Sequence, residues 1–246
     1  MERIFTEDKE TLMKPIRILA GLLCGSLVTG IASAEWSGKG KIGGVIARGN
    51  SDSATGNANL DVLNELERWH HKLGGSTLRT FTEQETSADR WELRAESDYK
   101  PTRRTFLFGS MRYENDRFTD YAYQGTAAIG YGYHFIATEA IKLDGKIGAG
   151  IRRTELRVTS DTEADDIVRG SLDFEHKLTN TTLMFNRFLV EHGPANTFMQ
   201  NLLGIEVKMT EALGLGLTYE VRRNTEVLPG TRNSDQVITA GLVVGF

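Results

Sequence analysis

Cysteine is almost absent from this chain of 246 residues, since Cys24 is the only one. Proline is scarce too, with four in all. A single thiol excludes an internal disulfide framework and a zinc site built from several cysteines. Pro101, Pro194 and Pro229 stand between the extended segments described below, where a missing N–H donor breaks no ladder of hydrogen bonds.

Long apolar runs are also missing, with the single exception of residues 18–34. Lys14 and Arg17 precede this run, and Ala32-Ser33-Ala34 ends it with a small-residue cleavage site. An anchor helix is the alternative, but the apolar core is shorter than the ~20 residues that a helical span needs. We therefore predict an N-terminal extension and a cleaved secretory signal peptide over residues 1–34, with translation starting at Met13.

Excess positive charge and catalytic motifs are absent as well. The net charge is −4 and the mean hydropathy is −0.32, so nothing suggests a nucleic-acid partner. There is no GxSxG or HExxH motif, and none of the five histidines has a serine at a recognisable spacing. We expect no catalytic residues, no cofactor and no metal site.

From Glu35 onwards the chain contains segments in which apolar and polar residues alternate, so that the pattern repeats every two residues. In residues 91–100 Trp91, Leu93 and Tyr99 share one face, while the other face carries only charged side chains. Strand side chains alternate in this way, whereas a helix would wrap the charges around its whole surface. The same alternation recurs in residues 121–135, 141–152, 213–222 and 238–246.

Turn signals divide residues 35–246 into about twelve such segments. Short turns are predicted at residues 67–68, 100–103, 137–139, 179–180 and 210–211. Longer loops are predicted at 49–53, 83–88, 118–120, 158–165, 193–196 and 227–233. Alternating short and long connections are typical of outer-membrane barrels. We predict one domain over residues 35–246, with an all-β fold: a transmembrane antiparallel up-and-down β-barrel.

The alternation alone does not say which face is inside. A soluble periplasmic barrel that binds an apolar ligand would bury the apolar face, and a membrane barrel would turn it to lipid. Long strands, aromatic residues near strand ends and glycines within strands favour the membrane barrel. The aromatic residues in question are Trp36, Trp91, Tyr99, Tyr121, Tyr133, Phe135 and Phe246.

Several motifs resemble those of a known family. Residues 49–52 read Gly-Asn-Ser-Asp, residues 106–109 read Phe-Leu-Phe-Gly, and residues 112–118 and 130–133 follow at similar intervals. These segments are similar to the YdiY-like family of salt-induced outer-membrane proteins, a domain of unknown function (481). The resemblance implies location in the Gram-negative outer membrane and carries no agreed activity. The resemblance also implies that the barrel-assembly machinery recognises the closing strand, which ends at Phe246. The other partners would be outer-membrane lipid and lipopolysaccharide.

With the apolar face towards lipid, charges of both signs line the bore. The predicted lumen charges are Glu92, Arg94, Glu96, Asp98, Arg112, Glu114, Asp116, Lys142, Asp144, Arg152, Arg169, Glu220 and Arg222. They form either a structural lattice of ion pairs or a narrow pore for ions or small solutes. The pore, or a role in envelope maintenance under salt stress, is the expected function. A lipid hydrolase on the outer wall is the alternative from another class.

Overall fold

The computed structural model describes residues 35–47, 53–82, 85–117, 119, 121–157, 160–227 and 232–246. The predicted signal peptide and the start at Met13 lie outside these residues, and so does the Gly-Asn-Ser-Asp motif at 49–52. Within the described residues, no helix is long and apolar enough to cross a membrane.

The described residues form twelve strands, as the turn signals predict. Their bounds are β1 Glu35–Ala47, β2 Ser53–Glu65, β3 Trp69–Thr82, β4 Glu85–Tyr99, β5 Thr105–Asp116, β6 Tyr121–Ala137, β7 Ile141–Leu156, β8 Thr162–Lys177, β9 Thr182–His192, β10 Thr197–Lys208, β11 Leu213–Asn224 and β12 Ser234–Gly245.

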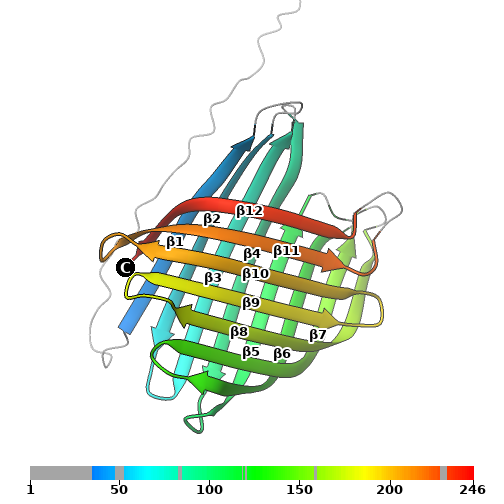
Figure 1. Ribbon diagram of the computed structural model, residues 1–246. Coiled ribbons are helices and arrows are strands. Elements are labelled where there is room, and N and C mark those ends of the chain that lie inside the picture. Colours follow the sequence, from blue (N-terminus) through cyan, green and yellow to red (C-terminus); the bar gives the residue numbers. More distant parts are fainter. Residues whose placement is uncertain are drawn as a thin grey trace, which may run out of the picture. The chain divides into compact units, whose positions relative to one another are not determined.

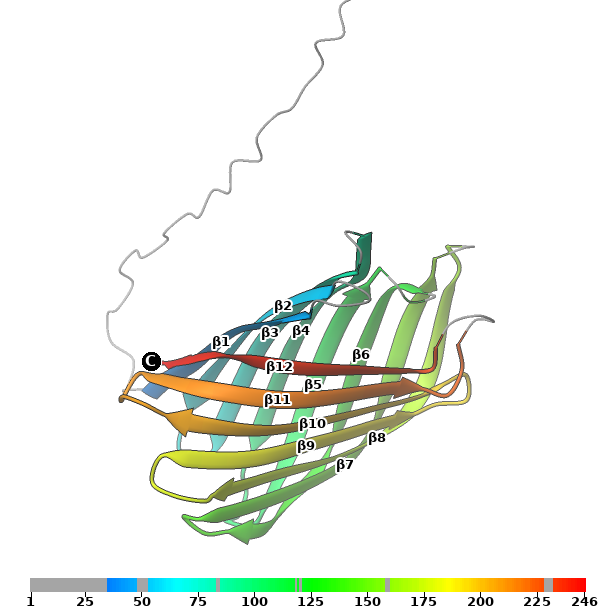
Figure 2. The ribbon, with the colours of Figure 1, turned by 45° about the horizontal axis from the view of Figure 1, so that its top comes forward.

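The strands close into one antiparallel barrel in which sequence neighbours pair (Figures 1 and 2). β12 pairs with β1 from Lys39↔Gly245 to Gly44↔Ala240, and Phe246 exchanges two backbone hydrogen bonds with Gly38. Beyond Gly44, β1 continues beside β2 alone. Closure leaves no free edge along the paired part of the wall, which is what a strand structure in lipid requires.

We call the end of the barrel that carries Glu35 and Phe246 the terminal rim, and the other end the distal rim. Turns at the terminal rim are three to five residues long. The predicted loops at the distal rim coincide with connections between strands, but two of them, at 83–88 and 158–165, were predicted too long. β4 already begins at Glu85 and β8 at Thr162, so only residues 225–233 form a clearly longer connection. Polar residues at those positions extend the strands beyond the apolar band and do not end them.

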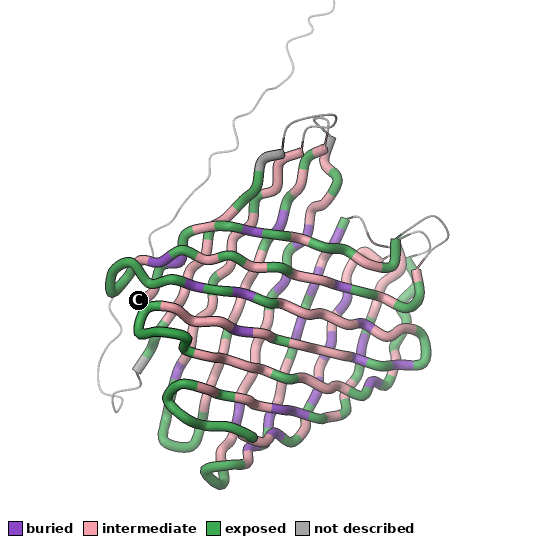
Figure 3. The backbone as a smooth tube through the Cα atoms, viewed as in Figure 1, coloured by how far each residue is buried: buried purple, intermediate pink, exposed green. Residues whose placement is uncertain are grey.

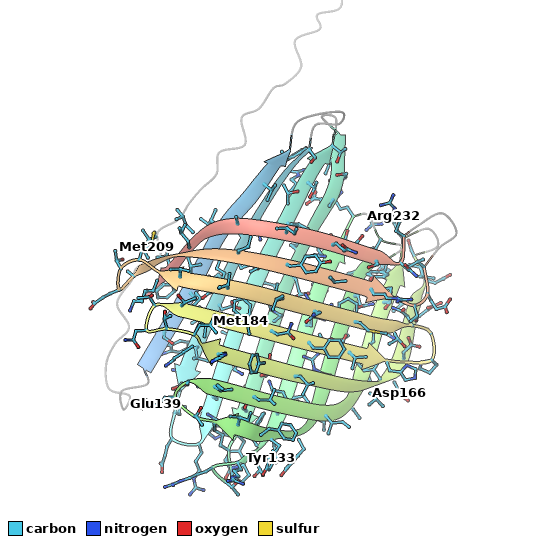
Figure 4. All side chains as sticks on the ribbon, viewed as in Figure 1. Tyr133, Glu139, Asp166, Met184, Met209 and Arg232 are labelled. Carbon is cyan, nitrogen blue, oxygen red and sulfur yellow. The ribbon has the colours of Figure 1, made fainter. Side chains whose placement is uncertain are left out.

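The apolar side chains lie on the outside of the barrel. Ile129 is 74% exposed, Ile147 65% and Leu217 50%, while their neighbours along each strand are far less accessible. Figure 3 shows this alternation of exposed and buried residues along the strands. A soluble barrel would enclose these side chains, so the structure has the opposite arrangement, with its apolar face outward.

Aromatic side chains form two belts on the outer face. Trp91, Tyr113 and Tyr123 follow one another at centroid distances of 5.3 and 5.6 Å in the distal half. Trp69 and Tyr99 are 5.0 Å apart close to the terminal rim. Such belts lie at the two membrane interfaces of transmembrane barrels.

Tyr121 does not lie on the outward face that the alternation of residues 121–135 predicts for it. The pairing of β6 with β7 shifts between Tyr121 and Tyr123, so Tyr121 stands opposite Leu156 while Tyr123 stands opposite Glu155. The extra residue of a bulge reverses the facing of the side chains beyond it. Tyr121 therefore faces the bore, within the electrostatic influence of Glu114 and Arg222.

Glycines in the wall make room for aromatic rings of the neighbouring strand. A Cβ atom on Gly132 would lie 2.1 Å from Phe106, and one on Gly204 would lie 2.2 Å from Phe185. Both rings are almost fully buried inside the barrel. Each ring covers a glycine across the ladder, so these two strand glycines serve close packing, as their position in the sequence pattern suggests.

Candidate functional site: the charged bore

Eight charged side chains meet inside the barrel, and we call them the central network. Every member pairs with at least one other at 3.9 Å or less. Glu191 is completely buried, and Glu114 and Arg112 are nearly so. The four cations and four carboxylates balance in charge: Arg90, Glu92, Arg112, Glu114, Arg169, Glu191, Glu220 and Arg222.

The central network crosses the bore. β5 and β11 are six strands apart in either direction around the twelve-stranded barrel, so they face each other. Arg222 of β11 donates to Glu114 of β5, which joins the two opposite walls. Arg90 of β4 reaches Glu220 of β11 at 3.4 Å, and Arg112 of β5 reaches Glu191 of β9 at 2.7 Å. A solute on the barrel axis would therefore meet these side chains.

Neutral groups complete the hydrogen bonding of the network. Arg112 also donates to the amide oxygen of Gln124 at 3.1 Å, and Gln200 donates to Glu220 at 2.8 Å. The ring of Phe198 lies 4.6 Å from the guanidinium of Arg112 and 4.9 Å from that of Arg222. Charges removed from water are stable only with such dense pairing, because their desolvation is costly.

Two smaller clusters lie nearer the terminal rim. In the first, Glu96 of β4 accepts from Lys72 of β3 at 3.2 Å and from Lys146 of β7. In the second, on the wall where β1 meets β12, Glu206 of β10 accepts from Lys39 at 2.8 Å and pairs with Lys41. Each contact in these clusters joins strands at most three positions apart, so the clusters line the bore and do not join opposite walls.

Beside the central network there remains a cavity of about 90 Å³, bordered by β1 to β4 and β9 to β12. Its charged lining holds five cations and three carboxylates: Lys41, Arg90, Arg94, Arg187, Arg222, Asp61, Glu92 and Glu220. Arg187 is the notable member. Its guanidinium lies 5.3 Å from the Phe185 ring, and it has no carboxylate partner among the residues that the structure describes.

The structure places the thirteen predicted lumen charges as follows. Glu92, Arg112, Glu114, Arg169, Glu220 and Arg222 belong to the central network, Glu96 and Asp98 to the cluster around Lys72, and Arg94 to the cavity. Arg152 donates to the backbone of Asn196 at 2.5 Å, and Asp116 is buried near the distal rim. Asp144 contacts His134 at 2.6 Å. Lys142 lies exposed close to the terminal rim, away from the network.

Sequence reasoning missed several members of the bore, above all Arg90, Glu191 and Arg187. Arg90 continues the alternation of residues 91–100 by one step and could have been found. Glu191 and Arg187 belong to β9, whose two faces are both rich in apolar residues, so its inward face was not evident from the pattern.

A further contact was also missed. Nδ1 of His71 lies 2.8 Å from Oγ of Ser97. The two residues are 26 apart in sequence and meet only because β3 and β4 pair in this register. Groups of acidic, histidine or cysteine side chains that could hold a metal ion are not found in the described part of the chain.

Comparison with solved structures finds other β-barrels. The NanC porin has a TM-score of 0.50 and 11% identity, covering 84% of this chain and 97% of that one. The translocator domain of the autotransporter NalP from Neisseria meningitidis has a TM-score of 0.48 and 12% identity, covering 86% of each chain. At these identities the likeness to the NanC porin supports the outer-membrane type of barrel fold.

Sequence comparison finds relatives along most of the chain. The uncharacterized protein YdiY of Escherichia coli (strain K12) is 22% identical over 176 residues, which are 72% of this chain and 68% of that protein. The family model described as "Protein of unknown function, DUF481" matches residues 40–246. The match covers nearly the whole barrel, and the chain therefore belongs to the DUF481 family, as its motifs predicted.

Proposed function

We propose that this protein lies in the Gram-negative outer membrane and forms a narrow pore that favours small anions. The observation behind the proposal is the bore itself, which is crossed by a neutral ion-pair network and keeps a cation-rich cavity at one side. About 90 Å³ holds a few waters and a small ion. Pockets for larger ligands occupy ~300–1,000 Å³.

The sign of the preference follows from the lining of the cavity. Five cations face three carboxylates, and Arg187 lacks a carboxylate partner among the described residues. Charged side chains in a narrow, partly desolvated passage select against ions of their own sign. Chloride and small carboxylates or phosphates should therefore pass more readily than potassium.

The terminal rim would face the periplasm, and β12 would present its end to the barrel-assembly machinery before it pairs with β1. Lipid and lipopolysaccharide would surround the outer face. A role in envelope maintenance under salt stress, which the resemblance implied, stays part of this proposal.

Purified protein in planar bilayers is expected to show small, discrete conductance steps. Under a potassium chloride gradient, the reversal potential should report preference for chloride. Arg187→Glu should reverse that preference, since it exchanges one cation of the cavity for an anion. The matched control is Arg153→Glu, an exposed position on the outer face of β7. Silent bilayers would refute the pore. A reversal potential that Arg187→Glu does not move would refute the anion preference that we assign to the cavity.

A further inference from the structure

Three polar residues interrupt the apolar outer face near the terminal rim. Asn64 of β2 pairs in register with His71 of β3, and His71 pairs with Ser97 of β4. They share the outward face with Leu60, Leu73 and Leu93, each about half exposed. Nδ1 of His71 and Oγ of Ser97 are 2.8 Å apart. The row thus places an imidazole within hydrogen-bond reach of a hydroxyl on the lipid side of the wall.

The imidazole is held in place from one side by aromatic rings. Trp69 stacks on His71 with 5.7 Å between centroids and an interplanar angle of 13°. Tyr99 in turn packs against Trp69. A base with a fixed ring orientation is what proton transfer from a neighbouring hydroxyl requires.

Asn64 is the third member of the row. It is 4% exposed, and its amide nitrogen has no hydrogen-bond partner. A buried amide group without a hydrogen-bond partner is destabilising. Asn64 stands beside His71 in register, on the side opposite Ser97. A proton on Nε2 of the imidazole needs an acceptor, which the oxygen of this amide can supply and its nitrogen cannot.

Ser97 also lines a hollow of about 420 Å³ that extends over β4 to β7. The outward lining of the hollow is apolar apart from Ser97. Small side chains alternate there with larger exposed ones: Ala95, Gly109, Met111, Ala127, Ile129, Ala149 and Ile151. Next to Ser97 in register is Gly109, where an added Cβ would meet nothing within 4 Å. The hydroxyl therefore borders open space on the outer wall.

The hollow has a direction relative to the membrane. Ser97 is two residues from the end of β4 at the terminal rim, whereas Ala149 is eight residues from the start of β7 at the same rim. The hollow thus rises from the level of the Trp69 and Tyr99 belt towards the middle of the wall. Lipid ester groups lie at the level of such belts, and their acyl chains point to the bilayer centre.

We propose that this row and hollow form a site for one glycerophospholipid of the periplasmic leaflet, and that Ser97 slowly hydrolyses its acyl ester. The acyl chain lies in the hollow, and the ester carbonyl lies beside Ser97. This site is on the outer wall, so the proposal stands independently of the pore.

The chemistry balances without a co-reactant other than water. His71, with its proton on Nε2, takes the hydroxyl proton of Ser97 at Nδ1, while Oγ attacks the carbonyl carbon. The bond from that carbon to the glycerol oxygen breaks, and His71 returns the proton to the leaving oxygen. Water, deprotonated by His71, then attacks the acylated serine, releasing the fatty acid and restoring Ser97.

The reaction should be slow. Ser97 lies mid-ladder between His71 of β3 and Gly109 of β5, so the backbone donors around it are engaged in the sheet. Loss of one donor to the developing oxyanion typically costs ~10²–10³ in rate. We therefore expect clear acylation by activated probes and only slow release of fatty acid from lipid.

The test uses the full barrel refolded in mixed micelles, with a fluorescent fluorophosphonate that carries a long alkyl chain. Labelling of the wild-type protein is expected, with its loss in Ser97→Ala and a large decrease in His71→Gln. Asn64→Leu should slow labelling, whereas Asn64→Asp, which keeps an acceptor oxygen, should label like the wild type. A purely structural role would not produce this difference. Heat-modifiable gel migration checks that each variant is folded.

Ser87→Ala is the control, because Ser87 lies on the same strand but its hydroxyl contacts Thr82 and no histidine in the described part of the chain. It should label like the wild type. Vesicles of phosphatidylethanolamine and phosphatidylglycerol should release fatty acid at a slow rate that depends on Ser97. A folded barrel that does not label, or labelling that survives Ser97→Ala, would overturn the proposal, whatever its conductance.

Discussion

Replacement of Arg112 by leucine is expected to lower the free energy of unfolding by about 3–5 kcal/mol, the range found when one partner of a buried ion pair is removed. Arg112 contacts Glu191 at 2.7 Å, Glu114 at 3.0 Å and Glu92 at 3.7 Å, and all four side chains are almost fully buried. The substitution leaves three carboxylates with fewer partners in a confined space. Urea unfolding of the barrel in lipid vesicles, followed by tryptophan fluorescence, measures the loss.

Arg94→Leu provides the comparison. Arg94 also contacts two carboxylates, Asp61 and Glu92, each at 3.3 Å, but its side chain is 37% exposed. Ion pairs in contact with water contribute only ~0–1 kcal/mol. If Arg112→Leu and Arg94→Leu lower the free energy of unfolding equally, burial does not determine how much the ion pairs of the central network contribute to stability.

Removal of the Glu114–Arg222 pair should raise the conductance several-fold. In Glu114→Ala combined with Arg222→Ala, the contact that joins the facing strands β5 and β11 disappears, and the net charge of the bore stays the same. The double variant therefore tests whether this pair obstructs the bore, without changing the net charge of the bore. Single-channel recording in planar bilayers at fixed salt gives the ratio of variant to wild-type conductance.

The control is a pair that does not span the bore. Lys72→Ala with Glu96→Ala also removes one cation and one carboxylate, but from neighbouring strands of the wall. Its conductance should stay close to that of the wild type. If both double variants conduct equally, the Glu114–Arg222 pair is not the constriction.

The twelve strands were predictable because side chains on a strand alternate, and in this chain polar and apolar residues follow that alternation almost everywhere. Residues 91–100 show this clearly, and the structure has β4 over all of them but Lys100, with Leu93 outward and Glu92 inward. Closure was predictable because an open sheet of this length would leave two unpaired edges.

Features that depend on the register between paired strands could not be predicted from the sequence. The bulge that turns Tyr121 inward arises from one extra residue in the β6–β7 pairing. The contact between His71 and Ser97 needs β3 and β4 to be aligned to the residue. A shift of one residue would move every side chain to the other face, and a single sequence does not fix the alignment of two strands.

The composition of the central network was only partly predictable for a related reason. Alternation identified Arg112, Glu114 and Arg222 as inward residues, but it did not show that Glu114 and Arg222 meet across the barrel. Glu191 was not found, since β9 carries Phe185 on its inward face and Phe188 on its outward face. Contacts across a bore depend on barrel shape, which follows from strand number and stagger together.

The central claim is that apolar side chains face lipid and charged ones face the bore. Its most direct test is spin labelling of successive residues from Gly214 to Glu220 of β11, in a Cys24→Ser background, with the protein in lipid vesicles. Collisions with oxygen, which concentrates in the bilayer, should be frequent at Leu215, Leu217 and Tyr219 and rare at Gly214, Gly216 and Thr218. The opposite alternation, or oxygen-shielded labels at Leu215 and Leu217, would contradict the inside-out assignment.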